Sequence, residues 1–248
     1  MIPFNQPAPP FLYQDFQSAA SAISDALALQ HSYMLLLGES GCGKTTLLRH
    51  LQQHLDKHSY SVLYLCHGQP SPSGLARVLA DAVHLPIRRT RAETSRLLVS
   101  TIKNLPTRLL FWIDEAQLIR DDTLHELRLL SEADLEGPPL FSVILSALPS
   151  LKERLLAPDL FPLWRRIGTR VRLRGLQQEE VTPFVNHCLG EGCAARFSAE
   201  ALAVIFEKAR GIPAIIKSYC AQCIRDSPPN IQISKQLTIE ILDSNETA

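Results

Sequence analysis

Short apolar runs alternate with helical patterns over the first two thirds of the chain. The runs at 33–37 and 108–113 are continuously apolar or nearly so, which predicts strands buried on both faces of a sheet. The predicted strands are 33–37, 61–66, 108–113, 140–146 and 169–173. Strands that alternate with helices favour an α/β fold, with a parallel sheet flanked by helices on both faces.

Apolar positions at helical spacing predict the elements between and after these strands. The pattern changes after Gly175, where helices follow one another without strands and predict a small all-helical domain. The first sixteen residues hold four prolines and predict an extended N-terminal lead that packs on the body. Asp121 or Asp122 is a suitable N-cap for its helix. The predicted helices are 17–30, 44–57, 73–84, 90–104, 121–130, 177–189, 198–209, 213–226 and, in the tail, 236–242.

A glycine-rich segment follows the first predicted strand. In such a loop the glycines let successive N–H groups turn toward one anion, and the helix after it adds its positive N-terminal end. Lys44 is expected to reach the β- and γ-phosphates, and the Thr45 hydroxyl to bind Mg²⁺. A turn without nucleotide is disfavoured, because the segment lies between a predicted strand and a predicted helix. The phosphate-binding loop comprises Gly38, Glu39, Ser40, Gly41, Cys42, Gly43, Lys44, Thr45 and Thr46.

Two carboxylates follow the third predicted strand, in the segment 111–117 (FWIDEAQ). Ligands of open α/β sheets bind at the carboxyl ends of the strands. Asp114 is expected to hold Mg²⁺, directly or through water, and Glu115 to polarise the attacking water as general base. The alternative is an acidic helix cap. The chain lacks the Asn-Lys-x-Asp motif that reads guanine, so ATP is favoured over GTP.

Two further features suit a site for nucleotide chemistry. Ser146 ends a strand and can sense the γ-phosphate, or it is an ordinary serine at a strand end. Arg165 and Arg166 form a pair, and an arginine supplied by a neighbouring subunit stabilises charge on the transferred phosphoryl group. The alternative for the pair is a solvated surface charge.

The charged residues balance over the whole chain, although one local segment is strongly basic. Lys and Arg total 25, and so do Asp and Glu, so a basic footprint over the whole chain is absent. Arg88, Arg89 and Arg91 form a local basic run whose natural partner is the phosphate backbone of double-stranded DNA. An exposed helix start or a contact between subunits is the alternative.

The N-terminus lacks the basic and apolar regions of a signal peptide, and no apolar run reaches the length of a membrane span. We therefore expect a cytoplasmic protein without membrane contact, whose six cysteines are reduced thiols. Four of them follow a spacing compatible with a zinc site, but buried thiols in a helical core are favoured. These four are Cys188, Cys193, Cys220 and Cys223.

The order of these features resembles the AAA+ ATPases, and in particular the ExeA-like branch, which includes transposon-targeting ATPases of the TnsC and TniB type. The resemblance implies a sheet order of 5-1-4-3-2 and a C-terminal helical lid. It also implies ATP and Mg²⁺ bound between neighbouring subunits, with Arg166 as the arginine finger of the next protomer. The expected division is therefore a lead at 1–16, a P-loop ATPase α/β domain at 17–175, and a lid with tail at 176–248. The resemblance rests on 38–48 (GESGCGKTTLL), 113–117 (IDEAQ), 124–131 (LHELRLLS), 149–166 (PSLKERLLAPDLFPLWRR) and 211–213 (GIP).

The sequence departs from that family pattern at two positions. Ala214 follows Gly-Ile-Pro, where the family usually has the arginine by which the lid senses the γ-phosphate. Leu148 stands before Pro149, where a polar glutamine is common. The first departure predicts slow turnover.

Three functions follow from these expectations. The first is a transposition regulator that forms a ring or filament with ATP on double-stranded DNA and links a target-site factor to a transposase. The second is an ATPase for secretion or pilus assembly; members of that type commonly add a membrane span and an envelope-binding domain, and neither appears in these 248 residues. The third is a nucleotide-dependent interaction switch with little turnover, which Ala214 suggests. The sequence favours the first.

Overall fold

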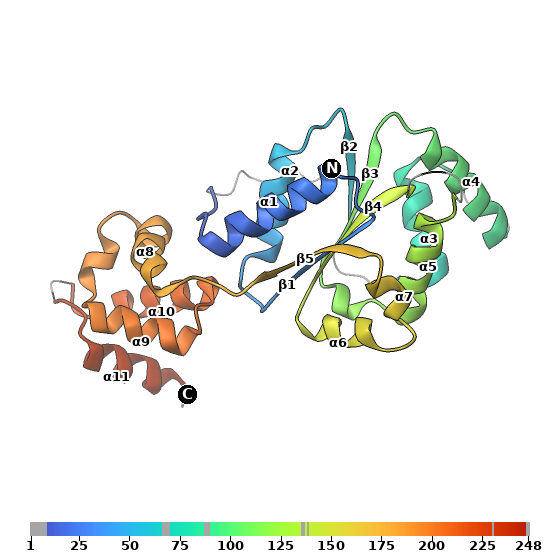
Figure 1. Cartoon of the computed structure of the whole chain (residues 1–248). Helices are drawn as coiled ribbons and strands as arrows, with labels where there is room; N and C mark the ends of the chain where they lie inside the picture. Colours follow the sequence, from blue (N-terminus) through green and yellow to red (C-terminus); the bar gives the residue numbers. More distant parts are fainter. Residues whose placement is uncertain are drawn as a thin grey trace. The chain divides into compact units, whose positions relative to one another are not determined.

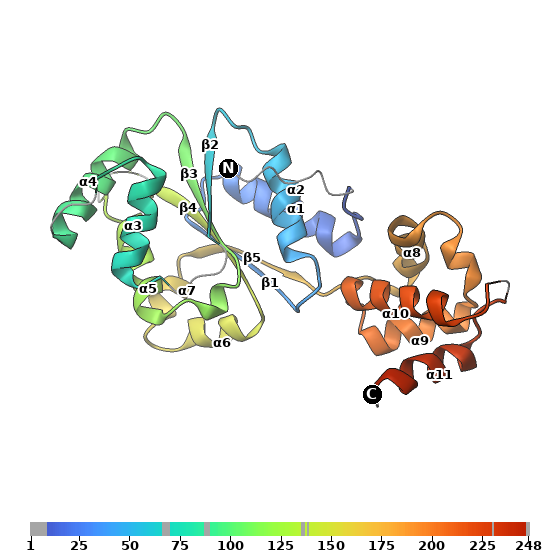
Figure 2. The same cartoon turned by 180° about the vertical axis from the view of Figure 1, so that it is seen from behind.

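The computed structural model describes residues 9–65, 70–86, 90–134, 137, 139–229 and 231–246. The chain forms two compact units, which we name by their main content. The sheet unit comprises 19–38 and 47–172. The helical unit comprises the residues before 19, 39–46 and those from 173 onward. Both are drawn in Figures 1 and 2.

The described strands form one five-stranded sheet in the order β2-β3-β4-β1-β5. The predicted order 5-1-4-3-2 is the same order read from the other edge, and it is confirmed. The pairs β1–β4, β3–β4 and β2–β3 are parallel. The strands are β1 (Tyr33–Gly38), β2 (Tyr60–Leu65), β3 (Arg108–Ile113), β4 (Phe141–Ala147) and β5 (Ile167–Leu173).

Burial explains the sequence pattern of the central strands. Every residue of β1 and of β4 is buried, so both faces of these strands need apolar side chains. The exceptions in β4 are serines whose hydroxyls have partners: Ser142 Oγ donates to His31 O at 2.9 Å and accepts from Arg108 Nε at 3.1 Å. The polar atoms of Ser142 are therefore compatible with the core.

Helices cover both faces of the sheet (Figure 1). The parts of α1 and α2 in the sheet unit lie on one face, and α3, α5, α6 and α7 lie on the other. The sequence patterns did not predict α6 and α7. The helices are α1 (Gln14–Ala28), α2 (Lys44–His54), α3 (Pro72–Ala82), α4 (Arg91–Lys103), the 3-10 helix η1 (Ala116–Leu118), α5 (Asp121–Ser131), α6 (Ser150–Leu156) and α7 (Phe161–Trp164).

The N-cap predicted for α5 is wrong. The residue in that position is Arg120, which has extended backbone and no side-chain cap. Asp121 and Asp122 follow this N-cap and lie in the first turn of the helix. A carboxylate there is stabilised by the positive end of the helix. Asp122 Oδ2 also pairs with Arg120 Nη2 at 2.6 Å. A run of candidate caps fixes such a boundary only to within a residue or two.

The helical unit is built around α9, which contacts α8, α10 and α11. Ser198 caps α9 by accepting the N–H of Ala201 at 3.1 Å. A parallel bridge between Phe197 and Ile233 closes the tail against the helices. From the N-terminal segment, Phe11 packs edge-on against Phe184 with ring centroids 5.5 Å apart. The elements are η2 (Gln178–Glu180), α8 (Val181–Leu189), η3 (Cys193–Arg196), α9 (Ala199–Ala209), α10 (Pro213–Asp226) and α11 (Lys235–Glu246).

Of the four cysteines with the spacing of a zinc site, Cys220 and Cys223 are core residues, whereas Cys188 and Cys193 are partly exposed. Cys220 and Cys223 are fully buried, and burial raises the pKa of Cys220 to about 12 and that of Cys223 to about 11. Within the described ranges, no three histidine, cysteine or acidic side chains gather to hold a metal ion. None of the described helices combines the length and the apolar character that crossing a membrane requires.

Candidate functional site

Two glycines with positive φ shape the phosphate-binding loop. Gly41 has φ +85° and Gly43 has φ +94°, in the region that residues with a Cβ rarely adopt. Inside the loop, Glu39 O accepts from Cys42 N at 3.3 Å and from Lys44 Nζ at 3.1 Å. Lys44 is 6% exposed although it is a lysine. The backbone is thus folded back on itself, with the lysine side chain lying over it.

Two groups from other parts of the helical unit bind carbonyls of this loop. Gly41 O accepts the N–H of Ala214 at 3.3 Å, and Cys42 O accepts the Tyr13 hydroxyl at 2.6 Å. Ala214 lies in the first turn of α10, whose N-cap Ile212 has no side-chain cap. The loop carbonyl therefore satisfies one of the N–H groups that every helix start leaves without an intrahelical partner.

The methyl group of Ala214 packs directly on the loop. A Cβ added to Gly41 would lie 2.8 Å from Ala214 Cβ and 3.2 Å from Ile212 Cγ2. The position where the family resemblance leads us to expect an arginine is thus occupied by a small side chain in close contact with the loop. The glycine at 41 is required by this close approach as well as by its φ.

Cys42 is a packing residue of the loop. It is fully buried, and burial is the main reason why the pKa of its thiol is raised. Its Sγ lies 3.9 Å from Arg174 O. The raised pKa keeps the thiol protonated near neutral pH, so it is not a nucleophile there.

A second group of polar residues lies in the sheet unit, and we call it the carboxylate cluster. Asp114 is 8% exposed. Its Oδ1 accepts from Ser146 Oγ at 2.8 Å and from Glu115 N at 3.0 Å. Its Oδ2 accepts from Tyr64 Oη at 3.1 Å. Three donors therefore hold this carboxylate in place. The cluster consists of Tyr64, Asp114, Glu115, Gln117 and Ser146.

The chain turns sharply at Glu115, which has φ 52° and ψ 40° and precedes η1. A non-glycine residue in this left-handed region costs about 1–2 kcal/mol, so contacts must hold it there. Gln117 Nε2 donates to Glu115 Oε2 at 2.6 Å, and Gln117 Oε1 accepts from Leu148 N at 3.1 Å. The Gln117 amide thus links the Glu115 carboxylate to the chain after β4. The helix-cap alternative for Glu115 is not realised by its side chain, which makes no cap hydrogen bond.

The register of the sheet places these residues at one edge. Leu37 of β1 pairs with Ala147 of β4, and Leu145 of β4 pairs with Ile113 of β3. The three strands therefore end together, and Asp114 follows one of these ends while Ser146 lies at another. This is the edge where parallel α/β sheets bind their ligands. The phosphate-binding loop starts there, since Gly38 is the last residue of β1.

The arginines have partners within the sheet unit. Arg166 Nε forms an ion pair with the Glu132 carboxylate, which Arg128 Nη1 also contacts at 3.2 Å. The Arg166 side chain is 45% exposed. Arg154 donates to Ile119 O at 2.7 Å and to Gln117 O, beside the carboxylate cluster. Arg88 and Arg89 lie outside the described residues. So does the side chain of Arg91, whose backbone begins α4.

Sequence reasoning did not single out Tyr13, Tyr64 or Gln117. Gln117 belongs to the recognised segment 113–117, so its place in the motif was the only available signal. Tyr13 and Tyr64 carry no motif, and their contacts join residues far apart in the chain.

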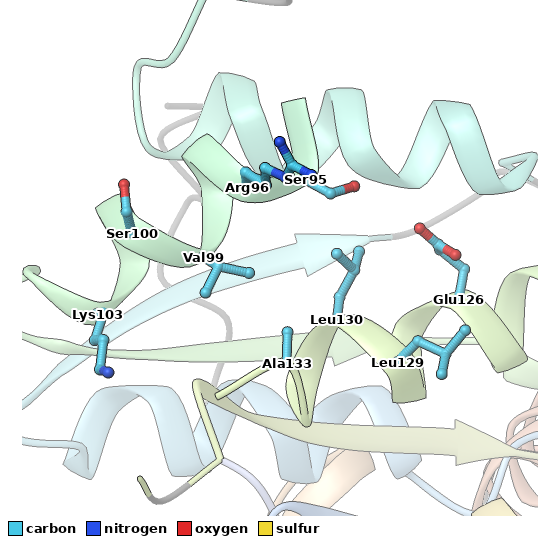
Figure 3. A pocket seen from close by; sticks show the side chains of 9 residues that line it. All are labelled: Ser95, Arg96, Val99, Ser100, Lys103, Glu126, Leu129, Leu130 and Ala133. Atoms are coloured by element: carbon cyan, nitrogen blue, oxygen red, sulfur yellow. The ribbon is translucent and has the colours of Figure 1, made fainter. Parts of the chain in front are cut away.

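The sheet unit also has a groove between α4 and α5, with a volume of about 610 Å³ (Figure 3). Val99 and Leu130 face each other across it, and Arg96, Lys103 and Glu126 supply polar side chains. Helix α5 returns the chain from the carboxyl end of β3 to the amino end of β4, and the groove lies along its second half. The groove is therefore away from the edge that carries Asp114.

Comparisons with known proteins identify relatives of this chain. Residues 28–155 match the model of the family described as "AAA domain". The chain is 29% identical over 234 residues to the "General secretion pathway protein A" of Aeromonas hydrophila. The match covers 90% of this chain but 42% of that protein, so the chain spans less than half of this relative.

Solved structures share the fold. The Aeropyrum pernix ORC2 protein superposes with a TM-score of 0.64 at 14% identity, over 96% of this chain and 70% of that one. Drosophila ORC bound to DNA superposes with a TM-score of 0.61 at 15% identity, over 100% of this chain and 70% of that one. At such low identity, the likeness shows the fold alone.

The two glycines of the loop give a matched pair of substitutions. Gly41→Ala and Gly43→Ala both place a Cβ at positive φ, at a cost of about 1–3 kcal/mol. At Gly41 the new methyl group meets Ala214, whereas among the described residues beyond its chain neighbours no atom lies within 4 Å of a Cβ on Gly43. We expect Gly41→Ala to lower the free energy of unfolding by about 1–3 kcal/mol more than Gly43→Ala, through overpacking against Ala214. Urea unfolding followed by circular dichroism measures the difference. Equal losses would contradict the contact with Ala214.

Proposed function

Because the chain belongs to the AAA domain family, we propose that it is an ATPase, which binds ATP with Mg²⁺ and hydrolyses it slowly. The observation that carries the proposal is the glycine loop with Lys44, which directly follows a central strand of a parallel sheet. The carboxyl end of a second central strand carries Asp114 and Glu115.

We assign the loop 38–46 to the phosphates. Its positive-φ glycines permit the backbone N–H groups to converge on an anion, and the start of α2 at Lys44 adds the positive end of a helix. Lys44 then neutralises the β- and γ-phosphates. The Lys44 ammonium, which donates to Glu39 O in this structure, exchanges that carbonyl for phosphate oxygens.

The donor set fits a magnesium ion. Mg²⁺ prefers hard oxygen ligands, which the Thr45 hydroxyl and the Asp114 carboxylate provide. Hydrogen bonds from Ser146, Tyr64 and the Glu115 N–H hold the Asp114 carboxylate in place, as the groups around a metal ligand do. When bound, the ion neutralises charge that develops on the phosphates. We assign Ser146 a positioning role through Asp114, since its buried hydroxyl donates to that carboxylate.

We assign Glu115 as general base. The Gln117 amide fixes its carboxylate, so the base is held before substrate arrives. Its left-handed backbone is consistent with strain stored at a reaction site.

We propose that Arg166 acts on the ATP of a neighbouring copy of this chain. A guanidinium stays charged at all relevant pH values and stabilises the phosphoryl group in transfer. In this structure Arg166 is held by Glu132, so assembly would exchange that ion pair for the nucleotide of the neighbour. Ala214 has no charge with which to sense the γ-phosphate, and this supports slow turnover or, in the limit, a nucleotide-dependent switch.

Two biological settings are compatible with this chemistry. The first is assembly on double-stranded DNA in transposition, with a transposase and a target-site factor as partners. The fold shared with Drosophila ORC bound to DNA and the run Arg88, Arg89 and Arg91 support it. The second is a role as an ATPase for secretion or pilus assembly, which the relative named General secretion pathway protein A supports. Both place this ATPase in the cytoplasm.

Removing the ammonium group of Lys44 tests whether the loop binds ATP. We expect Lys44→Ala to weaken the binding of a fluorescent ATP analogue by about 100-fold, because charge-assisted hydrogen bonds to phosphate are each worth up to about 3 kcal/mol. Lys57→Ala, at an exposed lysine outside the loop, is the control and should bind as the wild type does. Equal affinities for the two variants would remove Lys44 from the site.

Removing the negative charge at position 115 tests the general base. We expect Glu115→Gln to keep ATP binding and to slow hydrolysis by about 10²–10⁴-fold, the usual contribution of a positioned base. Phosphate release measures the rate, and Glu153→Gln on the exposed side of α6 is the matched control. Hydrolysis by Glu115→Gln at the wild-type rate would assign the base elsewhere.

The oligomeric state tests the role of Arg166 and separates the two settings. We expect a non-hydrolysed ATP analogue to drive assembly, and double-stranded DNA to promote it in the transposition setting. Sedimentation with and without DNA measures this. Arg166→Ala should lower hydrolysis in the assembled state, whereas Arg120→Ala, with a side chain 61% exposed, should not. A monomer under every condition contradicts the shared site, and assembly unaffected by DNA supports the secretion setting.

A further inference from the structure

We propose that Tyr13 is a positioning residue for the phosphate-binding loop, which fixes the peptide between Cys42 and Gly43 so that its N–H faces the phosphates. The proposal rests on the proposed nucleotide binding, because it assigns a residue that prepares the same loop.

The hydrogen bond between the Tyr13 hydroxyl and the Cys42 carbonyl is short and buried. Tyr13 is 4% exposed, Cys42 is fully buried, and the hydroxyl donates to Cys42 O at 2.6 Å. The two residues are separated by 29 positions in the sequence, so this bond is a tertiary contact. It binds the loop backbone itself and is independent of the side chain at position 42.

Because a peptide is planar, a hydrogen bond to its carbonyl also fixes the direction of its N–H. A trans peptide is planar and carries its C=O and N–H on opposite sides. The carbonyl of Cys42 and the N–H of Gly43 belong to the same peptide, so a carbonyl held by Tyr13 directs that N–H to the opposite side. An anion-binding loop needs this arrangement, with carbonyls outward and N–H groups inward.

On its glycine side this peptide has no side chain that fixes its orientation. Gly43 has no side chain, and a Cβ placed there would meet no described atom within 4 Å. Glycine accepts both signs of φ, so sterics alone do not select one orientation of this peptide. The hydroxyl of Tyr13 makes that selection. The neighbouring carbonyl, Gly41 O, is held separately by Ala214 N at 3.3 Å.

The tyrosine is itself held rigidly by its neighbours in the chain. Gln14 N donates to Glu180 Oε1 at 2.7 Å, and Asp15 Oδ2 accepts from Arg174 N at 2.9 Å. The ring of Tyr13 packs against Phe16 with centroids 5.8 Å apart. Burial, the largest cause, holds the pKa of Tyr13 well above its usual value, so the hydroxyl remains a donor throughout the neutral range.

Deleting this one hydroxyl tests the proposal. Tyr13→Phe keeps the ring and loses the bond, and we expect it to weaken binding of a fluorescent, non-hydrolysed ATP analogue with Mg²⁺ by about 3–10-fold, the scale of one hydrogen bond. Tyr60→Phe is the matched control. Its hydroxyl donates to a carbonyl in the same way, to Leu27 O at 2.7 Å, but within the sheet unit and outside the loop. It should leave the affinity unchanged. Thermal unfolding of both variants separates stability from binding.

A rescue variant completes the test. Replacement of Tyr13 by 4-aminophenylalanine restores a donor at the same place, and it should return the affinity to within about 2-fold of the wild type, because the lost hydrogen bond is remade. This variant also gives the answer if Tyr13→Phe does not fold.

The outcomes separate this proposal from the function on which it rests. Wild-type protein that does not bind the analogue overturns both. Wild-type binding with Tyr13→Phe equal to Tyr60→Phe, or with no rescue by the amino variant, overturns the role of Tyr13 alone. Weakening in Tyr13→Phe with rescue supports it.

Discussion

The polar groups of a peptide point in opposite directions, and this constraint governs the loop between β1 and α2. If its N–H groups are to face an anion, its carbonyls must face the protein and find donors there. Each donor is supplied differently: Lys44 Nζ for Glu39 O, the start of α10 for Gly41 O, and the Tyr13 hydroxyl for Cys42 O. The N-terminal segment and the start of α10 are thereby bound to the loop backbone.

In the carboxylate cluster of the sheet unit, the acceptor that needs donors is a side chain and not a backbone carbonyl. There the acceptor is a buried carboxylate, and the surroundings supply the donors. Asp114 accepts from a strand-end serine, a tyrosine of the neighbouring strand and the next backbone N–H. Burying an ionised carboxylate is costly unless such bonds compensate it, so the cluster also explains why polar residues are tolerated at the ends of apolar strands. Gln117 extends the network to Glu115 and to the chain beyond β4.

The sequence predicted the sheet well, because central strands buried on both faces must be apolar throughout, as β1 and β4 are. Lys44, Asp114 and Glu115 were singled out from the sequence because local spacing, next to a strand, defines the roles proposed for them. Tyr13 follows no such rule, since its partner is a backbone carbonyl, which has no signature in the sequence. The N-cap of α5 was misplaced by one or two residues, because aspartates suit both the cap and the first turn.

The loop and the elements on either side of it belong to different units. Residues 39–46 belong to the helical unit, but the strand before them and most of the helix after them belong to the sheet unit. The polypeptide crosses between the units at four peptide junctions, after residues 18, 38, 46 and 172. Two of these junctions border the loop itself. The eight residues 39–46 are thus joined at both ends to elements of the sheet unit, while two of their backbone carbonyls accept hydrogen bonds from Tyr13 and Ala214 of the helical unit.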